Sequence, residues 1–349
     1  MKKNILVAPL NWGLGHATRC IPIINALKEH DFEPIIASDG AALELLIKEF
    51  PELQTFELPS YNITYSAKGS NFKWKLLFQM PKMFRAIHNE RKIIEKIIEN
   101  YAIQGVISDN RLGVFSKKVP SVFITHQLQV LSGTTSFLTT FIHKLYIKKY
   151  RYCWVPDVDK TPNLSGKLGH LKETINNIFY IGPISRLHKK ELPKKYDVMV
   201  ILSGPEPQRT MLENRLILEL KTAPKKILFI KGIIENEQRI WQEKSITFVN
   251  FMNAEQLENA FNESEILICR SGYTTVMDIS KLGKKVFFIP TPGQYEQEYL
   301  AQKFESEGIA PFCNQDNFKI SKLERVPLYK GFTHLKFETP WKKMFKVFE

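Results

Sequence analysis

The chain has 349 residues, which is enough for two α/β domains, and its apolar fraction of 44% and charged fraction of 24% are ordinary for a globular protein. No stretch approaches the roughly 20 apolar residues of a membrane-spanning helix, and the four cysteines have no metal-type spacing, so we expect a cytosolic protein with reduced thiols. The formal net charge of +13 favours anionic partners, which can be phosphorylated substrates, anionic lipid or nucleic acid.

The chain begins with an apolar segment, a glycine-rich turn and a helical pattern. We predict a strand over residues 5–9 and a helix over 18–30, joined by a turn that contains Gly13, Gly15 and His16. The two glycines let the backbone approach a ligand closely. His16 follows the carboxyl end of the first strand, which is where open α/β sheets bind ligands.

Strand and helix signals alternate through the rest of the first half. We predict strands over 33–38, 54–58, 105–109 and 121–125, helices over 40–50 and 73–101, a break in the second of these helices near Pro81, and a loop over 61–71. This alternation is typical of a doubly wound parallel sheet.

The second half repeats this organisation after a segment rich in proline, lysine and polar residues. We predict strands over 197–202, 226–231, 246–249, 266–269 and 286–289, a helix that ends at Leu220, and helices over 253–261, 274–282 and 294–307. The pattern therefore predicts an N-terminal Rossmann-like domain over 1–184, a linker over 185–196 and a C-terminal Rossmann-like domain over 197–330. We expect the tail over 331–349 to end in an amphipathic helix that packs back on the N-terminal domain.

A second turn of the phosphate-binding type follows the strand at 266–269. The turn and the first helical residues are Arg270, Ser271, Gly272, Tyr273 and Thr274. Backbone N–H groups at the start of a helix bind anions. Asp278 lies about two helical turns further on, where its carboxylate can accept hydrogen bonds from a sugar diol. Phosphate and ribose together indicate a nucleotide, whereas the plainer alternative is an ordinary turn in which Ser271 caps the helix.

The two turns, each in a Rossmann-like half, resemble those of GT-B glycosyltransferases. The closest pattern is that of family 28, which includes the peptidoglycan N-acetylglucosaminyltransferase that forms lipid II. The C-terminal likeness runs from residue 266 through Asp278 to Gln297 and Glu298, and the N-terminal likeness is limited to the turn with His16 and the strand before His126. The resemblance implies a GT-B fold, in which two doubly wound parallel-sheet domains face a cleft.

The resemblance also implies roles in the donor site. Asp278 matches the acidic residue that binds the nucleotide ribose, although the family more often has Glu there. Gln297 and Glu298 match a Gln pair that holds the donor sugar, and the second position departs from that pattern. Gly204 lies in the loop that matches a Gly-Gly-Ser turn, here with fewer glycines. The family implies no metal or other cofactor, and no Asp-x-Asp motif occurs in a suitable loop.

Glycosyl transfer requires a base for the acceptor hydroxyl and stabilisation of the departing diphosphate. His16 is the candidate base, because imidazole titrates near neutrality, and Asp109 is expected either to orient His16 or to cap the next helix. His126 and the two glycines beside His16 are expected at the acceptor side, unless His126 is simply a hydrogen-bonded loop residue. Arg209 is expected to pair with the diphosphate, the alternative being a surface arginine in a first helical turn.

Basic and aromatic residues gather at helical spacing in two segments, residues 68–96 and 137–151. Such a segment either lies on an anionic membrane or presents a core-facing stripe and a solvated basic face. Nucleic acid is not an expected partner, because the chain has no RNA- or DNA-binding motif and its basic residues are mixed with aliphatic ones.

The sequence therefore predicts an inverting hexosyltransferase that moves a sugar from a nucleotide-sugar, expected to be a UDP-sugar, to a hydroxyl acceptor that is lipid-linked or part of a glycan. We expect it in the cytoplasm or on the inner face of the cytoplasmic membrane, in cell-envelope synthesis. A nucleotide-sugar hydrolase or 2-epimerase on the same fold stays open because of Glu206 and Glu298. A non-enzymatic nucleic-acid-binding protein is the remote alternative.

Overall fold

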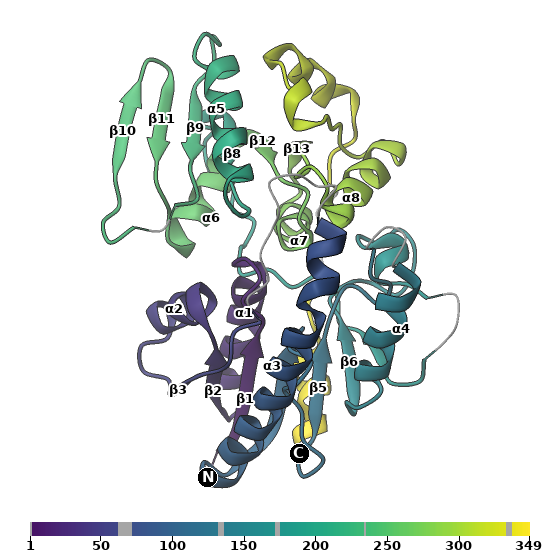
Figure 1. Cartoon of the computed structure of the whole chain (residues 1–349). Coiled ribbons are helices and arrows are strands. Elements are labelled where there is room, and N and C mark those ends of the chain that lie inside the picture. The colour runs from purple at the N-terminus through teal and green to yellow at the C-terminus, as the bar shows by residue number, and fades with distance from the viewer. Residues whose placement is uncertain (1, 62–71, 132–135, 172–174, 234, 333–336) are drawn as a thin grey trace. The chain divides into compact units, whose positions relative to one another are not determined.

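The computed structural model describes residues 2–61, 72–131, 136–171, 175–233, 235–332 and 337–349, and for residues 72–83 and 138 it describes the backbone only. These residues fall into two compact units (Figure 1). The first unit contains the described residues up to 186 together with 337–349, and the second contains those from 187 to 332. The loop predicted at 61–71 lies outside the described residues, apart from Tyr61.

A seven-stranded sheet forms the centre of the first unit, in the order β3-β2-β1-β4-β5-β6-β7, and its described pairs are parallel. The strands are β1 (Lys3–Pro9), β2 (Phe32–Ser38), β3 (Thr55–Glu57), β4 (Ile103–Asp109), β5 (Ser121–Ile124), β6 (Tyr152–Val155) and β7 (Ile178–Tyr180). The helices are α1 (Gly15–Glu29), α2 (Gly40–Glu49), α3 (Phe72–Asn100), α4 (Ser136–Ile147) and the 3-10 turn Gly166–Leu168.

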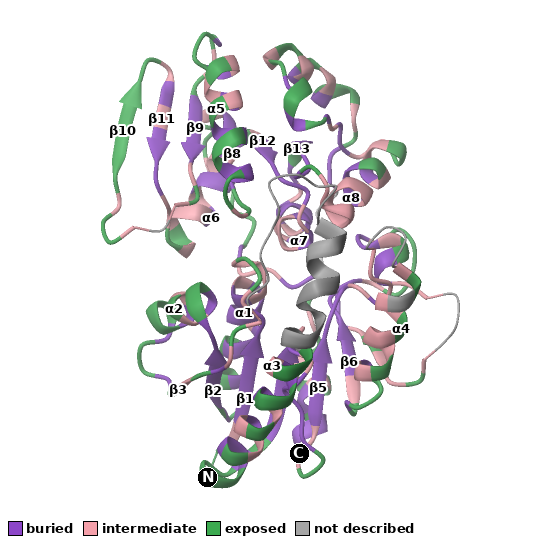
Figure 2. Ribbon diagram, viewed as in Figure 1, coloured by how far each residue is buried: buried purple, intermediate pink, exposed green. Residues whose placement is uncertain are grey.

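Alternate residues of β1 enter two different cores, because successive side chains of a strand point to opposite faces. Ile5 and Val7 pack with apolar residues of α1 and α2, whereas Leu6 and Ala8 pack with isoleucines of α3. All four are fully buried, and Figure 2 shows β1 buried in the middle of its unit. A parallel strand covered on both faces is an almost continuous apolar run, which is the pattern that the sequence of β1 has.

The first unit differs from its prediction in two respects. α3 is continuous from Phe72 to Asn100, so the expected break near Pro81 is wrong. α1 likewise continues through Pro22, because the apolar contacts of a long helix offset the hydrogen bond that a proline removes. The sequence analysis also does not predict β6 and β7. β7 lies at the edge of the sheet and none of its three residues is buried, so no buried face imposes a pattern on its sequence.

The end of the chain completes the core of the first unit. α9 (Trp341–Phe345) and the 3-10 turn Lys346–Phe348 follow one another, and both Phe345 and Phe348 are buried. The Phe348 ring lies so close to β4 that a Cβ on Gly105 would be 2.3 Å from it. Only glycine at position 105 leaves room for this ring, so the C-terminal residues and β4 depend on one another.

A six-stranded sheet forms the second unit, in the order β10-β11-β9-β8-β12-β13. Its strands are β8 (Tyr196–Ile201), β9 (Ile227–Ile230), β10 (Ile240–Glu243), β11 (Ile246–Val249), β12 (Ser264–Cys269) and β13 (Lys285–Phe288). Its helices are α5 (Gln208–Leu220), α6 (Ala254–Glu263), α7 (Tyr273–Leu282), α8 (Tyr295–Ser306) and the 3-10 segments Gln315–Asn317 and Ile320–Leu328. The described pairs are parallel except that β10 joins β11 antiparallel, at an exposed edge (Figure 2). The sequence pattern does not reveal β10, because an exposed edge strand has no buried face that would impose alternation.

The segment before β8 is held against α6. The backbone N–H of His188 donates to the Glu258 carboxylate at 2.7 Å, and that of Lys190 donates to the side-chain oxygen of Asn262 at 2.9 Å. Much of the segment predicted as a linker, residues 187–195, therefore packs as part of the second unit.

Candidate active site

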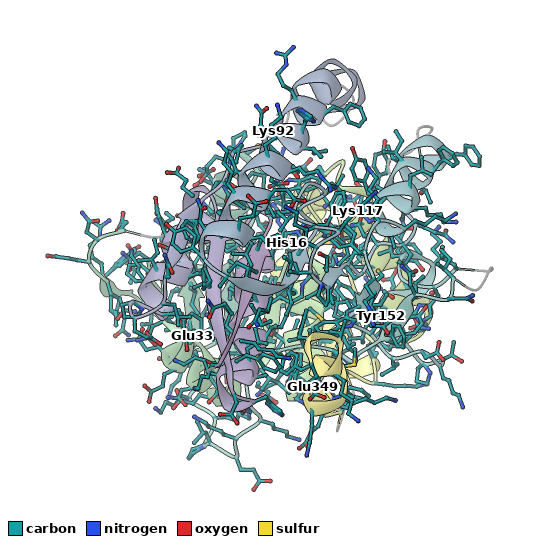
Figure 3. All side chains as sticks on the ribbon, turned by 90° about the horizontal axis from the view of Figure 1, so that it is seen from below. His16, Glu33, Lys92, Lys117, Tyr152 and Glu349 are labelled. Carbon is teal, nitrogen blue, oxygen red and sulfur yellow. The ribbon has the colours of Figure 1, made fainter. Side chains whose placement is uncertain are left out.

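His16 follows the carboxyl end of β1, an interior strand of the first sheet. β1 ends at Pro9, the following loop turns at Gly13 with a φ of +72°, and α1 begins at Gly15. His16 is therefore in the first turn of α1, with 13% of its side chain exposed (labelled in Figure 3). The positive φ at Gly13 favours glycine, and no described atom lies within 4 Å of the place where its Cβ would be.

Asp109 ends β4, the strand beside β1, and is in register with Pro9. This adjacency places its carboxylate next to His16, with Asp109 Oδ1 2.8 Å from His16 Nδ1. Burial by itself would raise the pKa of Asp109, but the Arg19 guanidinium and then His16 hold that pKa well below its usual range. The carboxylate is therefore ionised at neutral pH and accepts hydrogen bonds.

A third charged residue, Arg19, joins this pair. Arg19 is 1% exposed; its Nε donates to Asp109 Oδ2 at 2.8 Å, and its Nη2 donates to Oδ1. Nη2 also lies 3.0 Å from His16 Nδ1, and Nη1 lies 3.2 Å from Nδ1 of His126, which follows β5. The structure thus brings the predicted residues His16, Asp109 and His126 together around an arginine that the sequence motifs do not indicate. The available signal was spacing, since residues three apart on a helix share a face.

The turn predicted to bind phosphate lies at the carboxyl end of β12. Gly272 is the N-cap of α7 in an extended conformation, and Thr274 is half-buried in the first turn. Ser271 is fully buried, and its hydroxyl donates to the backbone carbonyl of Gln297 at 2.7 Å. Asp278 is the sixth residue of α7 and is half-buried. Ser271 therefore connects this turn to α8, and its hydroxyl is engaged within the protein.

A carboxylate already lies at the N-terminus of α7. The backbone N–H of Tyr273 points to Oε1 of Glu296 at 3.4 Å. The positive end of the helix dipole attracts any anion, whether a side chain or a ligand. Glu296 is another residue of the site that the sequence motifs do not indicate, because its position depends on how α8 packs beside α7.

Two predicted donor-sugar residues on α8 shape the loop after β13. Gln297 Oε1 accepts from the N–H of Thr291 at 2.8 Å, and Glu298 Oε1 accepts from the N–H of Gly293 at 2.8 Å. Gly204, in the loop after β8, has a φ of +104°, and its Cβ would lie 3.9 Å from the Thr291 hydroxyl. The loops after β8, β12 and β13 therefore meet at one edge of the second sheet.

Arg209 is engaged within the protein. Its Nε donates to Glu206 at 2.6 Å, and its Nη1 donates to Glu213 at 2.6 Å and to the Lys231 carbonyl at 3.2 Å. The residue is 8% exposed. A diphosphate could bind this guanidinium only by replacing one of the carboxylates, and the exposed Glu206 is the one that could move away.

Arg270 belongs to the framework of this edge. It is 1% exposed and donates to the carbonyls of Ile289, Pro290 and Gln208 and to the side-chain oxygen of Gln315. Burial lowers its pKa to about 10, which still leaves it charged at neutral pH. Arg270 therefore holds three segments together at the site.

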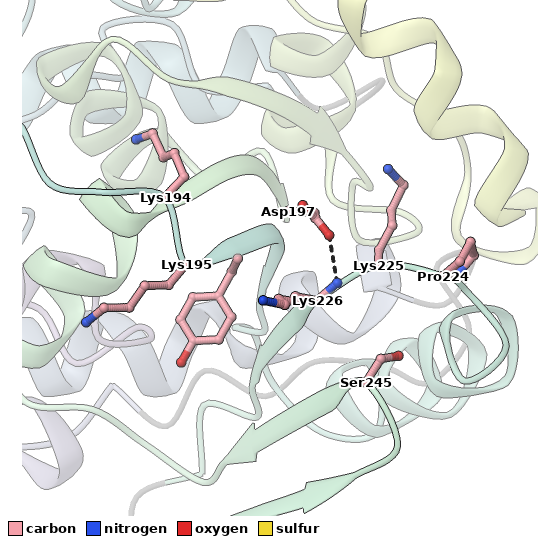
Figure 4. Close-up of a pocket in the computed structure, with 8 residues that line it drawn as sticks. Lys194, Lys195, Asp197, Pro224, Lys225, Lys226 and Ser245 are labelled. Carbon is pink, nitrogen blue, oxygen red and sulfur yellow. Dashed lines mark hydrogen bonds between the residues drawn. The ribbon is translucent and has the colours of Figure 1, made fainter.

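Two surface hollows lie at the opposite edge of the second sheet, where strands begin. They have volumes of about 420 and 600 Å³, and each is lined by several lysines. In the smaller one the lysine side chains point away from one another, and Asp197 accepts from the backbone N–H of Lys226 at 2.7 Å (Figure 4). Lys194, which borders both hollows, donates to the carbonyl of Asn262 near the end of α6. Among the described residues, neither hollow is lined by a predicted site residue.

Within the described ranges, no three His, Cys, Asp or Glu side chains are grouped as a metal site would require. The same part of the chain contains no helix that is both long and apolar enough to cross a membrane.

Residues 208–344 match the glycosyltransferase family 28 C-terminal domain. A glycosyltransferase of Methanopyrus kandleri, itself uncharacterised, is 21% identical over 305 residues, which cover 81% of this chain and 84% of the relative. The UDP-N-acetylglucosamine–N-acetylmuramyl-(pentapeptide) pyrophosphoryl-undecaprenol N-acetylglucosamine transferase of Haemophilus influenzae is 22% identical over 324 residues, which cover 90% of this chain and 86% of the relative.

Solved structures agree in fold. MurG of Acinetobacter baumannii has a TM-score of 0.61 at 12% identity and covers 99% of each chain. The spinosyn rhamnosyltransferase SpnG has a TM-score of 0.62 at 13% identity, over 100% of this chain and 95% of the other. Two α/β units with largely parallel sheets are the architecture of these enzymes. The chain is therefore a glycosyltransferase with the GT-B fold that resembles MurG, and its residues 208–344 match the C-terminal domain of family 28.

Proposed function

We propose that this glycosyltransferase moves a sugar from a UDP-sugar to the hydroxyl of a lipid-linked acceptor, with inversion at the anomeric carbon. The observation that carries the proposal is the 2.8 Å contact between His16 Nδ1 and the buried Asp109 carboxylate. A carboxylate–imidazole pair at the carboxyl edge of a parallel sheet is suited to removing a proton from a bound hydroxyl.

The pair gives each nitrogen of His16 a role. Asp109 is ionised and can only accept, so Nδ1–H of the neutral imidazole donates to it and Nε2 keeps its lone pair. Nε2 takes the hydroxyl proton as the acceptor oxygen attacks the anomeric carbon. The bond from that carbon to the diphosphate oxygen breaks, and its electron pair leaves with the nucleoside diphosphate. Attack from the face opposite the leaving group inverts the carbon.

The donor diphosphate is proposed to bind at the N-terminus of α7. The backbone N–H groups of Tyr273 and Thr274 and the helix dipole favour negative charge there. Glu296 must turn away from the Tyr273 N–H when the diphosphate binds, because two anions would repel each other. Asp278 is proposed to accept hydrogen bonds from the ribose. Support for UDP comes from the Haemophilus influenzae relative, whose name includes UDP-N-acetylglucosamine.

The exposed face of α4 is the observation from which we propose a lipid-linked acceptor. Phe137, Phe141 and Leu145 are 86%, 53% and 46% exposed, and their spacing of four residues aligns them in one apolar stripe. Lys148 and Lys149 follow directly after this helix and are exposed. Exposed apolar side chains beside lysines suit a helix that rests on anionic lipid. The name of the Haemophilus influenzae relative includes pyrophosphoryl-undecaprenol.

We therefore propose that α4 rests on the cytoplasmic face of an anionic membrane. In this segment the stripe points outward, which differs from the core-facing alternative. In the other basic and aromatic segment, residues 68–71 and the side chains of 72–83 lie outside the described residues.

A thermal-shift panel with UDP, GDP, dTDP and several UDP-sugars tests the donor proposal. A ligand that binds only the folded protein raises its apparent stability by mass action. We expect a selective rise with UDP or with one UDP-sugar and loss of that rise in Asp278→Ala. Absence of a shift with every nucleotide would count against the proposed donor site.

Product analysis then separates transfer from the alternative chemistries. The protein is incubated with the stabilising UDP-sugar, with and without a lipid extract that contains polyprenyl-linked acceptors. Transfer requires that UDP release depend on the acceptor and that the product carry an inverted linkage. Release of free sugar or of a 2-epimer without acceptor would instead identify a hydrolase or epimerase.

A further inference from the structure

The buried guanidinium of Arg19 contacts both His16 and Asp109, the pair proposed for proton transfer, and also a second histidine. Arg19 donates to both carboxylate oxygens of Asp109, and it also lies 3.0 Å from Nδ1 of His16 and 3.2 Å from Nδ1 of His126. A guanidinium has five N–H donors and no acceptor. Each of its contacts therefore restricts which partner atoms can carry a proton.

The contact with His126 requires a lone pair on Nδ1. A protonated Nδ1 would place one N–H against another, because Nη1 of Arg19 can only donate. His126 must then be neutral, with its proton on Nε2. It is 6% exposed, so the contact is shielded from water.

The contact with His16 involves a competition for the same nitrogen. Nδ1 of His16 has an acceptor, Asp109 Oδ1, at 2.8 Å and a donor, Arg19 Nη2, at 3.0 Å. Nη2 already donates to Oδ1, so the shorter contact is the hydrogen bond, and Nδ1 carries the proton. The guanidinium then acts on His16 through its charge, which balances that of Asp109.

We propose that Arg19 is a positioning residue that fixes opposite tautomers in His16 and His126 and limits how strongly Asp109 stabilises the protonated form of His16. The role of His16 in this inference rests on the proposed function. The imidazolium formed during transfer faces an ion pair rather than a lone carboxylate, so it gives up its proton readily to complete the cycle.

The other groups around this cluster do not change its charge. The Cys20 thiol lies 3.8 Å from Asp109 Oδ2, and burial raises its pKa well above the usual value, so it is neutral. Burial lowers the pKa of His143 to about 4, so that ring is also neutral near pH 7. Among the contacts of the described residues, the charges that face His16 are therefore those of Asp109 and Arg19.

The tautomers can be measured without any substrate. The full chain is labelled with ¹⁵N in its eight histidines, and the ring nitrogens of His16 and His126 are assigned with His16→Gln and His126→Gln. We expect the His16 proton on Nδ1 and the His126 proton on Nε2. The reverse assignment for either ring would overturn the proposal.

Arg19 variants then test the charge balance. In Arg19→Gln the carboxylate faces His16 alone, so we expect the acid limb of the kcat/KM profile to move to higher pH and kcat to fall by about 100-fold through misplacement of the ring. KM for the donor should stay the same, since the proposed donor contacts come from other residues. Arg19→Lys keeps the charge but loses the fork, so its acid limb should stay in place while the His126 signals show mixed tautomers.

These experiments separate the inference from the proposed function. A folded Arg19→Gln with the wild-type pH profile contradicts the charge balance. If Arg19→Gln does not fold, the tautomers measured in the wild type and in Arg19→Lys still test whether Arg19 positions the two histidine rings. If His16→Gln keeps wild-type turnover, the proposed base is wrong, whereas the measured tautomers still stand on their own.

Discussion

The carboxyl edges of the two sheets are built differently. At the edge of the first sheet, charged side chains are buried and bonded to one another, as in the contact of Asp109 with Arg19 and His16. At the edge of the second sheet, the loops are held mainly by contacts between side chains and backbone, as in Ser271 with Gln297 and Gln297 with Thr291. The first edge therefore pairs its charges with one another, as the proposed proton transfer requires. At the second edge the proposed anion site is the start of α7, where the Glu296 carboxylate now lies.

The largest effect should come from the base at the first edge. His16→Ala should lower kcat by about 10²–10⁴-fold, because a positioned general base contributes that much. The affinity for UDP should not change, since the proposed nucleotide contacts lie in the second unit. Steady-state kinetics and calorimetric titration with UDP measure the two effects. Comparable losses in kcat and in the affinity for UDP would contradict the proposal that the first edge supplies the base and the second edge binds the nucleotide.

Asp109→Asn should cost stability as well as activity. Removal of one partner of a buried ion pair leaves the Arg19 charge uncompensated, which costs about 3–5 kcal/mol. The pKa of Asp109 lies below its unfolded value of about 3.9, so its ionised form stabilises the fold above that pH, and this stabilisation is lost as pH falls. Urea unfolding of the wild type should therefore weaken more steeply than that of Asp109→Asn between about pH 5 and 2. If the unfolding free energies of the two proteins depend on pH in the same way, ionised Asp109 does not stabilise the fold as proposed.

Asp278→Ala should affect the second edge only. Loss of a hydrogen bond to a charged group costs about 1.5–3 kcal/mol, which is about 10–100-fold in the dissociation constant of UDP. The kcat at saturating donor should change much less. Asp278→Asn serves as the matched control, because it keeps the shape and loses the charge. Unaltered UDP binding in both variants would show that the ribose is held elsewhere.

The smallest effect on the isolated protein should come from α4. Phe137→Ser with Phe141→Ser should leave the unfolding free energy within about 0.5 kcal/mol, because these side chains are exposed. Sedimentation with anionic vesicles should fall, and turnover with a soluble acceptor should be maintained. Exposed Leu328, in the second unit, offers a control as Leu328→Ser. Equal vesicle binding by both variants would rule out α4 as the membrane contact.

The sequence by itself determined the architecture and the turns. Apolar runs such as Ile5–Ala8 are continuous because a parallel strand is covered on both faces. The glycine and serine turns that follow such runs lie at the edge where a ligand is proposed to bind. The edge strands β7 and β10 could not be predicted, because neither has a buried residue that would impose a periodic signal. The sequence analysis also did not predict β6.

Only the tertiary structure decided which side chains share a site. Arg19 and Asp109 are 90 residues apart in the chain, and their contact exists because β1 and β4 are neighbours in the sheet. Arg209, a phosphate candidate by position, is engaged by Glu206 and Glu213, while Glu296 reaches the start of α7. The local sequence pattern indicates which helix or strand a residue belongs to. The pairing of charged side chains cannot be read from it, because only tertiary packing brings their atoms within hydrogen-bond distance.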